Sequence, residues 1–257
     1  MCALKPLRRC AALLAATACL GALPAHADEV LVAVAANFAG PLQKIAEGFT
    51  AATGHTLKPS AGATGKFYTQ IVAGGAPFQV LIAADDETPK KLIAAGHAVA
   101  GSQFTYAIGQ LVLWSATPGL VDEQGAVLAQ AGRFSKLAIA NPRIAPYGAA
   151  ALEVLKARGL TEAVTPRLVT ADSIAQAHQF IASGNAELGF VALSQVAVPG
   201  KPVTGSVWKV PHNLYGEIRQ DAVLLKPGEK SAAAKALLAY LKSAPAKVVI
   251  ASYGYKE

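Results

Sequence analysis

Short apolar runs alternate with longer amphipathic stretches along most of this chain. Apolar runs bounded by turn residues are typical of buried strands, whereas apolar positions three and four residues apart predict helices. Strands are expected at residues 30–35, 55–59, 79–83, 106–114, 137–140, 168–170, 188–192 and 221–225. Helices are expected at residues 38–50, 65–73, 88–95, 147–157, 173–183, 230–241 and 245–252. This alternation predicts an α/β fold with largely parallel sheets.

The N-terminal segment has the pattern of a secretory signal peptide. A basic head that ends at Arg9 precedes an apolar run from about Cys10 to Leu23, and Ala25-His26-Ala27 has the small residues of a cleavage site. The apolar run is shorter than the roughly 20 residues that a membrane-spanning helix needs. We therefore expect residues 1–27 to be a signal peptide that is cleaved after Ala27.

Cleavage at this point changes the bulk properties of the chain. All three cysteines, Cys2, Cys10 and Cys19, precede the cut, so the remaining chain needs no disulfide and has no thiol chemistry. A lipid anchor on Cys19 is the weaker alternative, since the preceding Ala-Thr-Ala matches a lipoprotein site poorly. The formal charge falls from +7 by three basic residues to +4, without a dense basic run, so binding to nucleic acid is not supported.

The segment Ser60–Phe67 (SAGATGKF) resembles a loop that cradles phosphate groups. A P-loop requires glycine at the position of Ser60 and a hydroxyl residue at the position of Phe67, so a nucleotide site is not supported. Small residues between a strand and a helix still direct backbone N–H groups toward an anion. The loop can therefore bind an anion, and the identity of that anion has to be inferred from other features of the chain.

Four of the predicted strand-to-helix turns carry a polar or aromatic donor at the start of the helix, namely Asn37, Thr64, Tyr147 and Ser173. Ligands of parallel α/β sheets lie at the carboxyl ends of the strands, facing helix N-termini with unpaired N–H groups and a partial positive charge. Each turn alone is also explained by helix capping. The four turns together favour a site for an oxyanion.

Four segments give the chain a family resemblance: Ala35-Ala-Asn-Phe38, Gly62-Ala-Thr-Gly-Lys66, residues 184–194 (GNAELGFVALS) and residues 218–225 (IRQDAVLL). Together they resemble the periplasmic molybdate-binding proteins of ABC transporters, over essentially the whole chain after the signal peptide. The resemblance implies a two-lobed type II periplasmic binding protein, each lobe a largely parallel sheet flanked by helices, with two crossover strands as hinge. Lobe 1 is expected at residues 28–107 with 220–257, and lobe 2 at residues 108–219.

The resemblance also implies the ligand-binding residues. The molybdate contacts fall on Asn37, Thr64, Tyr147 and Ile174, where Ile174 offers only its backbone N–H. Ala36, Ala63 and Ser173 are possible additional contacts. The chain departs from some relatives at Ala192, where they have a tyrosine whose hydroxyl reaches the anion. We expect the hydroxyl of Tyr147 to replace it.

The implied function is capture of molybdate, and of tungstate, in the periplasm and delivery to the permease and ATPase subunits of an ABC importer. The protein is expected to be a monomer and to use no cofactor and no coordinated metal. Another tetrahedral oxyanion, such as sulfate or phosphate, is the alternative ligand. An enzyme on the same scaffold is a distant alternative, because the four turns offer no paired base and nucleophile.

Several other polar residues have structural interpretations. Asp85-Asp86-Glu87 is expected to begin a helix rather than to bind a metal. The four histidines after the signal peptide, at positions 55, 97, 178 and 212, show no metal-ligand spacing. Lys66 is expected to be solvated, and Asp172 to cap its helix.

Overall fold

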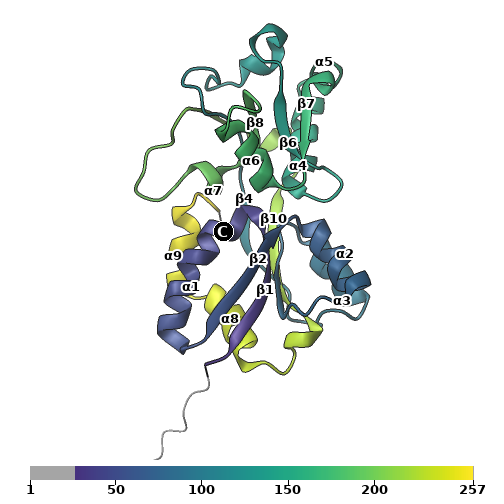
Figure 1. Ribbon diagram of the computed structural model, residues 1–257, viewed down its shortest axis with the longest axis vertical. Coiled ribbons are helices and arrows are strands. Elements are labelled where there is room, and N and C mark those ends of the chain that lie inside the picture. The colour runs from purple at the N-terminus through teal and green to yellow at the C-terminus, as the bar shows by residue number, and fades with distance from the viewer. Residues whose placement is uncertain (1–26, 257) are drawn as a thin grey trace, which may run out of the picture.

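The computed structural model describes residues 27–256, which form two lobes that lie one above the other (Figure 1). Each lobe is built on a five-stranded sheet flanked by helices. The signal-peptide segment up to residue 26, with all three cysteines, lies outside the described residues, so its cleavage and the anchor on Cys19 stay predictions. None of the helices in the described part of the chain is long and apolar enough to cross a membrane.

The first sheet has the strand order β2-β1-β3-β10-β4. Its strands are β1 (Glu29–Ala35), β2 (Thr56–Gly62), β3 (Val80–Ile82), β4 (Phe104–Gly109) and β10 (Ile218–Leu224). Strands β1, β2 and β3 are parallel, whereas β10 runs antiparallel to β3 and β4. Its helices are η1 (Ala36–Phe38), α1 (Ala39–Thr53), α2 (Thr64–Gly74), α3 (Glu87–Ala94), η6 (Lys226–Gly228), α8 (Ala232–Leu241) and α9 (Ala244–Ser252).

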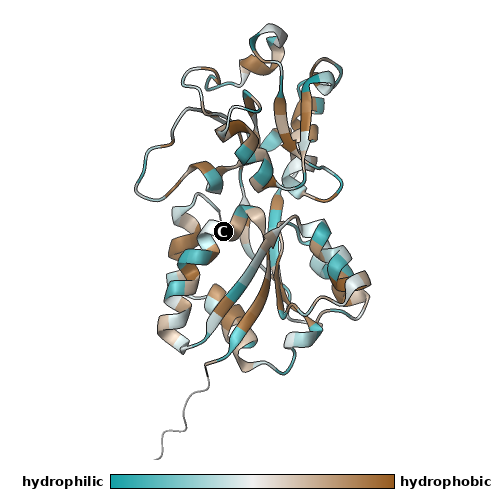
Figure 2. Cartoon of the chain, in the orientation of Figure 1, coloured by the Kyte–Doolittle hydropathy of each residue, from teal (hydrophilic) through white to brown (hydrophobic). Residues whose placement is uncertain are grey.

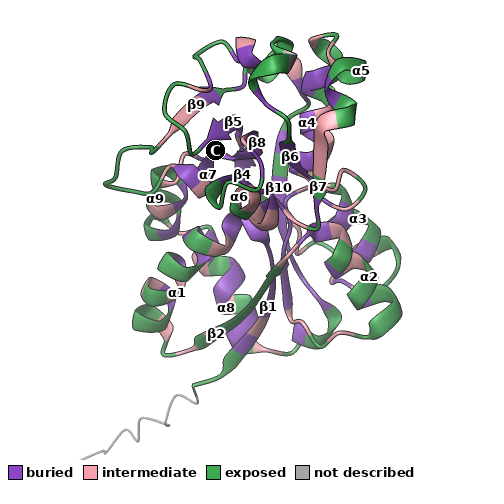
Figure 3. Cartoon of the chain, turned by 45° about the horizontal axis from the view of Figure 1, so that its top comes forward, coloured by how far each residue is buried: buried purple, intermediate pink, exposed green. Residues whose placement is uncertain are grey.

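Alternate residues of β1 face the two layers of helices that cover this sheet. Val30, Val32 and Val34 pack in one buried cluster with residues of α1, α8 and α9. Ala33 faces the opposite cluster, which contains residues of α2 and α3. Successive residues of a strand point to opposite faces, so the central strands β1 and β3, covered on both faces, consist almost entirely of apolar residues, whereas the edge strand β2 is largely exposed. Figure 2 shows the apolar strands, and Figure 3 shows that burial concentrates on them.

The second sheet has the strand order β7-β6-β8-β5-β9. Its strands are β5 (Leu111–Ser115), β6 (Leu137–Ala140), β7 (Leu168–Ala171), β8 (Leu188–Ala192) and β9 (Ser206–Lys209). Strand β6 is parallel to β7 and β8, and β5 runs antiparallel to β8 and β9. Its helices are η2 (Ala126–Ala129), η3 (Ala131–Arg133), α4 (Pro146–Ala157), α5 (Thr161–Val164), η4 (Thr165–Arg167), α6 (Ile174–Ala182), α7 (Leu193–Val196) and η5 (His212–Leu214).

The chain passes between the sheets at two places. Strand β4 belongs to the first sheet and β5 to the second, with Gln110 between them, and the chain returns from β9 through η5 to β10. The single strand expected at residues 106–114 is therefore wrong. It is two strands in different sheets, and the apolar pattern continued across the change because both strands are buried. Strand β9 and the short helices α5 and α7 were not predicted.

The α/β architecture confirms the expected fold class, since in each sheet a single strand, β10 or β5, runs opposite to its neighbours and helices flank the sheet. Strands β6 and β8 occupy the expected residues. The proposed division of the chain into lobes at residues 107/108 and 219/220 stays a prediction, although the sheet change at Gln110 lies close to the first boundary.

Candidate functional site

The starts of four helices meet between the two lobes. Helices η1 and α2 follow strands β1 and β2 of the first sheet, and α4 and α6 follow strands β6 and β7 of the second. They surround a small, narrow cavity of about 10 Å³. Its lining residues are Ala35, Ala36, Asn37, Gly62, Ala63, Thr64, Ala84, Ala145, Pro146, Tyr147 and Ile174. The structure therefore brings together all four predicted contacts and two of the three additional ones.

Asn37 is buried at the start of η1, with 2% of its surface exposed. Its side-chain Nδ2 donates to Oε1 of Gln220 at 2.9 Å and to the hydroxyl oxygen of Tyr255 at 2.9 Å. An amide group has two hydrogens, and both are used inside the protein. The remaining donor of Asn37 is its backbone N–H, which is the group that can contact an anion. This N–H lies in the first turn of a helix and has no partner within that turn.

Thr64 is the first residue of α2 and is 1% exposed. Its Oγ1 does not cap the helix; it accepts a hydrogen bond from the backbone N–H of Ala84 at 3.0 Å. A hydroxyl that accepts in this way keeps its hydrogen available for donation. Thr64 is therefore set to donate into the cavity.

Tyr147 reaches the cavity from the second lobe, near the start of α4, and is 1% exposed. Its hydroxyl oxygen accepts a hydrogen bond from Nε2 of Gln220 at 2.9 Å. Burial, together with the neighbouring Tyr255, raises the pKa of Tyr147 well above its ordinary value. The phenol therefore stays protonated and neutral. Its hydrogen can go to the neighbouring hydroxyl of Tyr255 or to a bound anion, which is the stronger acceptor.

Ile174 is the first residue of α6 and lines the cavity, so its backbone N–H lies among the unpaired donors of that helix start. Ser173 does not line the cavity; its Oγ accepts from the backbone N–H of Gln176 at 3.3 Å and caps the helix. The expected cap by Asp172 is thus wrong. Asp172 instead pairs with Lys66 at 2.9 Å, across the lobes, and both side chains are substantially exposed.

The lining residues of the cavity include no ionisable group other than the neutral Tyr147. The positive potential comes from helix N-termini, each worth about half an elementary charge, and from oriented N–H and O–H dipoles. A carboxylate would repel an anion, and the cavity has none. Neutral donors that converge from several sides suit a small tetrahedral oxyanion.

Ala192, the position of the missing tyrosine, is fully buried at the end of β8 and does not line the cavity. Its backbone N–H donates to Oε1 of Gln195 at 3.0 Å. Tyr147, in contrast, lines the cavity. The replacement of one hydroxyl by the other stays a prediction.

The sequence reasoning did not single out the buried polar residues behind the cavity. Gln220 and Tyr255 hold Asn37, and Ser194 donates to the backbone oxygen of Asn37 at 2.9 Å. One signal was available: the polar residues Arg219, Gln220 and Asp221 follow one another in β10, so at least one of them has to face the buried interior. Buried polar residues in a central strand need partners, so such a run indicates a polar cluster.

The acidic run expected at a helix start lies there. Oδ1 of Asp85 accepts from the backbone N–H of Thr88, in the first turn of α3, at 2.7 Å. Burial raises the pKa of Asp85. Among residues 27–256, no group of three or more His, Cys, Asp or Glu side chains is placed to hold a metal ion.

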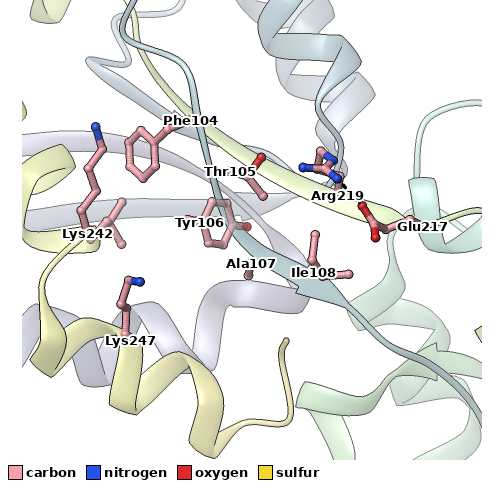
Figure 4. A pocket seen from close by; sticks show the side chains of 10 residues that line it. Phe104, Thr105, Tyr106, Ala107, Ile108, Glu217, Arg219, Lys242 and Lys247 are labelled. Atoms are coloured by element: carbon pink, nitrogen blue, oxygen red, sulfur yellow. Dashed lines mark hydrogen bonds and ion pairs between the residues drawn. The ribbon is translucent and has the colours of Figure 1, made fainter. Parts of the chain in front are cut away.

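A larger hollow of about 520 Å³ lies on the outer side of β4 (Figure 4). Lys242 lies over the ring of Phe104 at 4.1 Å, and Arg219 pairs with Glu217 at 2.6 Å. None of the predicted contacts lies in this hollow. Its charged side chains therefore belong to a different surface from the small cavity.

The sequence profile described as bacterial extracellular solute-binding protein matches residues 30–256. The chain belongs to the family of bacterial extracellular solute-binding proteins. The solute-binding protein is 59% identical over 234 residues to the molybdate-binding protein ModA of Azotobacter vinelandii, covering 91% of this chain and 92% of that relative. It is 54% identical to the molybdate-binding protein ModA of Rhodobacter capsulatus, covering 91% of this chain and 90% of the relative.

The fold of the solute-binding protein is also that of a solved relative. The structure of the Azotobacter vinelandii periplasmic molybdate-binding protein superimposes with a TM-score of 0.86 at 45% sequence identity. The match covers 89% of this chain and 99% of the other. The two-lobed fold and the resemblance to molybdate-binding proteins expected from the sequence motifs are thereby confirmed.

Proposed function

We propose that this solute-binding protein captures molybdate between its two lobes and delivers it to an ABC importer. The observation that carries the proposal is the cavity itself, in which Thr64 from one lobe and Tyr147 from the other each have a hydroxyl hydrogen that is not used by the partner bonded to the hydroxyl oxygen. The high identity to two proteins named for molybdate binding supports the same ligand. Tungstate, with the same charge and nearly the same size, is expected to bind as well.

Binding follows from the geometry without a chemical step. Hydrogen bonds to a charged acceptor contribute about 1.5–3 kcal/mol each, and a dianion in this cavity receives donors from both lobes. A ligand that contacts both lobes stabilises their closed arrangement relative to an open one. Catalysis is not proposed, because the lining residues offer no base and nucleophile in contact.

Two of the contacts between the lobes lie at the start of α2, outside the cavity. The backbone N–H of Gly65 in α2 donates to the carbonyl oxygen of Ile144 in the second lobe at 2.9 Å. The ion pair of Lys66 with Asp172 lies beside it. We propose that the protein is a monomer in the periplasm. Its closed form, with these contacts made, is the form that the permease and its ATPase recognise.

Thermal unfolding in the presence of different anions tests the proposed function. Residues 28–257 are unfolded with molybdate, tungstate, sulfate or phosphate at matched ionic strength. A ligand at 100 times its dissociation constant adds about 2.7 kcal/mol of stability, which shifts the melting temperature of a chain of this size by roughly 5–11 °C. We expect the shift with molybdate and tungstate. A shift with sulfate or phosphate alone would overturn the ligand, and no shift with any of the four would overturn the function.

A further inference from the structure

Gln220 is a fully buried amide in β10, one of the segments that connect the lobes. Its side chain touches both halves of the binding cavity without lining it. Oε1 accepts from Nδ2 of Asn37 at 2.9 Å, and Nε2 donates to the hydroxyl oxygen of Tyr147 at 2.9 Å. One side chain therefore connects a residue at the first-lobe wall with a residue at the second-lobe wall.

The polarity of this amide decides what the hydroxyl of Tyr147 can offer. A phenol has one hydrogen to donate, and an amide NH₂ group can only donate to it. With Nε2 of Gln220 directed at the phenol oxygen, the hydrogen of Tyr147 has to point away from Gln220, toward the hydroxyl of Tyr255 or toward an anion in the cavity. Burial raises the pKa of Tyr147, so this hydrogen stays in place at ordinary pH.

The neighbours of Gln220 favour this orientation of its amide. The group opposite Oε1 is the NH₂ of Asn37, which cannot accept a hydrogen bond, so a reversed amide would place two donors face to face. The hydroxyl of Tyr106 lies 2.9 Å from the same Oε1 and 2.9 Å from the carbonyl oxygen of Ala83. Unpaired buried donors cost more than most hydrogen bonds contribute, so the reversed orientation is disfavoured.

The packing leaves this group little freedom to move. Gly109, at the end of β4, lies against both side chains: a Cβ atom there would overlap the hydroxyl oxygen of Tyr147 and lie 2.5 Å from Nε2 of Gln220. The side chains of Tyr147 and Gln220 thus occupy the space that any larger residue would need. Their mutual orientation is fixed by the backbone of the connecting strands as well as by the hydrogen bond.

We propose that Gln220 is a positioning residue that fixes the Tyr147 hydroxyl as a donor toward the bound oxyanion. This inference rests on the proposed function of the cavity. Gln220 acts through Tyr147 and does not touch the ligand. Because it also holds Asn37, Gln220 aligns donors of both lobes on the same anion. Replacing its NH₂ group by an acceptor would turn the Tyr147 hydrogen away from the ligand without changing the shape of the site.

A double-mutant cycle tests the proposal, with molybdate dissociation constants measured by titration calorimetry. Gln220→Met removes both the donor to Tyr147 and the acceptor of Asn37 with little change in shape. It is made in the wild-type and the Tyr147→Phe background, so the effect through Asn37 is common to both and cancels in the cycle. One charge-assisted hydrogen bond corresponds to roughly a 10- to 100-fold change in affinity. We expect that loss from Gln220→Met when Tyr147 is present, and a loss at least fivefold smaller when it is absent. Equal losses in both backgrounds would overturn the proposal.

Gln220→Glu keeps the shape but replaces the donor by an acceptor, which draws the Tyr147 hydrogen away from the ligand. Its negative charge persists in the Tyr147→Phe background, so only the part of the loss that disappears there reports on the hydroxyl. We expect the loss to be smaller in the Tyr147→Phe background, and an unchanged loss would overturn the proposal. This second cycle tests the proposal if Gln220→Met fails to fold. Thermal unfolding of each variant without ligand shows whether it folds.

Tyr106→Phe is the matched control. It removes a hydroxyl next to the same Gln220 amide, but on the side of Oε1 and away from the cavity. We expect its dissociation constant to stay within about threefold of the wild-type value. A loss as large as that of Gln220→Met would show that the cluster acts through packing and overturn the proposal. Failure of the wild-type protein to bind molybdate would instead contradict the proposed function.

Discussion

At the scale of single residues, Thr64 is the simplest test of the site because its hydroxyl has one bond inside the protein and one hydrogen left. We predict that Thr64→Val weakens molybdate binding by about 10- to 100-fold, the worth of one hydrogen bond to a charged acceptor. Titration calorimetry measures it. Thr69→Val, in the same helix with a hydroxyl that bonds Gly65 O on the exposed side, is the control and should bind normally. Equal affinities for the two variants would remove Thr64 from the site.

The residue types at the site were predictable, but the atoms that they use were not. A small residue, an asparagine or a threonine at a helix start indicates a donor, and Asn37, Thr64, Tyr147 and Ile174 do meet at one cavity. The sequence could not show that the amide of Asn37 is consumed by Gln220 and Tyr255, because these partners lie 183 and 218 positions away. Only the three-dimensional packing leaves the backbone N–H of Asn37 as its donor.

At the scale of elements, Ser173 separates capping from ligand binding. Its hydroxyl caps α6, so we predict that Ser173→Ala lowers the free energy of unfolding by about 1 kcal/mol and changes the molybdate affinity less than threefold. Urea unfolding and calorimetry measure the two effects. Ser231→Ala removes the equivalent cap of α8, far from the cavity, and should behave in the same way. A much larger affinity loss for Ser173→Ala would place its hydroxyl in the site.

The start of α2 also controls how closely the lobes approach. A Cβ atom on Gly65 would lie 2.8 Å from Cα of Ile144 in the opposite lobe, closer than packed atoms allow. We predict that Gly65→Ala weakens molybdate binding at least tenfold, while the ligand-free protein unfolds at a similar temperature because only the contact between the lobes is affected. Gly74→Ala, at the other end of the helix where no atom lies within 4 Å, is the control. Normal affinity of Gly65→Ala would contradict the role of this contact.

The order of the elements was predictable because apolar runs and helical patterns alternate clearly. Their assignment to sheets was not: β4 and β5 look like one strand, because Gln110 is a single polar residue between two buried runs. Likewise, β9 was missed because it is a short strand whose residues are only partly apolar and partly buried. Hydrophobic periodicity reports burial, and it does not report which sheet provides it.

At the scale of the whole molecule, the ion pair of Lys66 with Asp172 links the lobes outside the cavity. Exposed pairs contribute about 0–1 kcal/mol and are screened by salt. We predict that Lys66→Gln weakens molybdate binding by no more than about fivefold at low ionic strength, with the difference vanishing in 1 M salt. Lys58→Gln, which breaks an exposed pair with Glu29 inside one lobe, should have no effect. A large loss that persists in salt would mean that Lys66 contacts the anion.

The central claim is that a molybdate ion lies between the lobes, held by neutral donors from both. The most direct test is the anomalous scattering of molybdenum in crystals of the protein grown with molybdate. The account predicts one strong molybdenum peak in the cavity. The oxygens bound to that metal should lie within hydrogen-bonding distance of Thr64 Oγ1 and Tyr147 Oη. A peak only in the hollow beside Phe104 and Lys242, or none between the lobes, would contradict it.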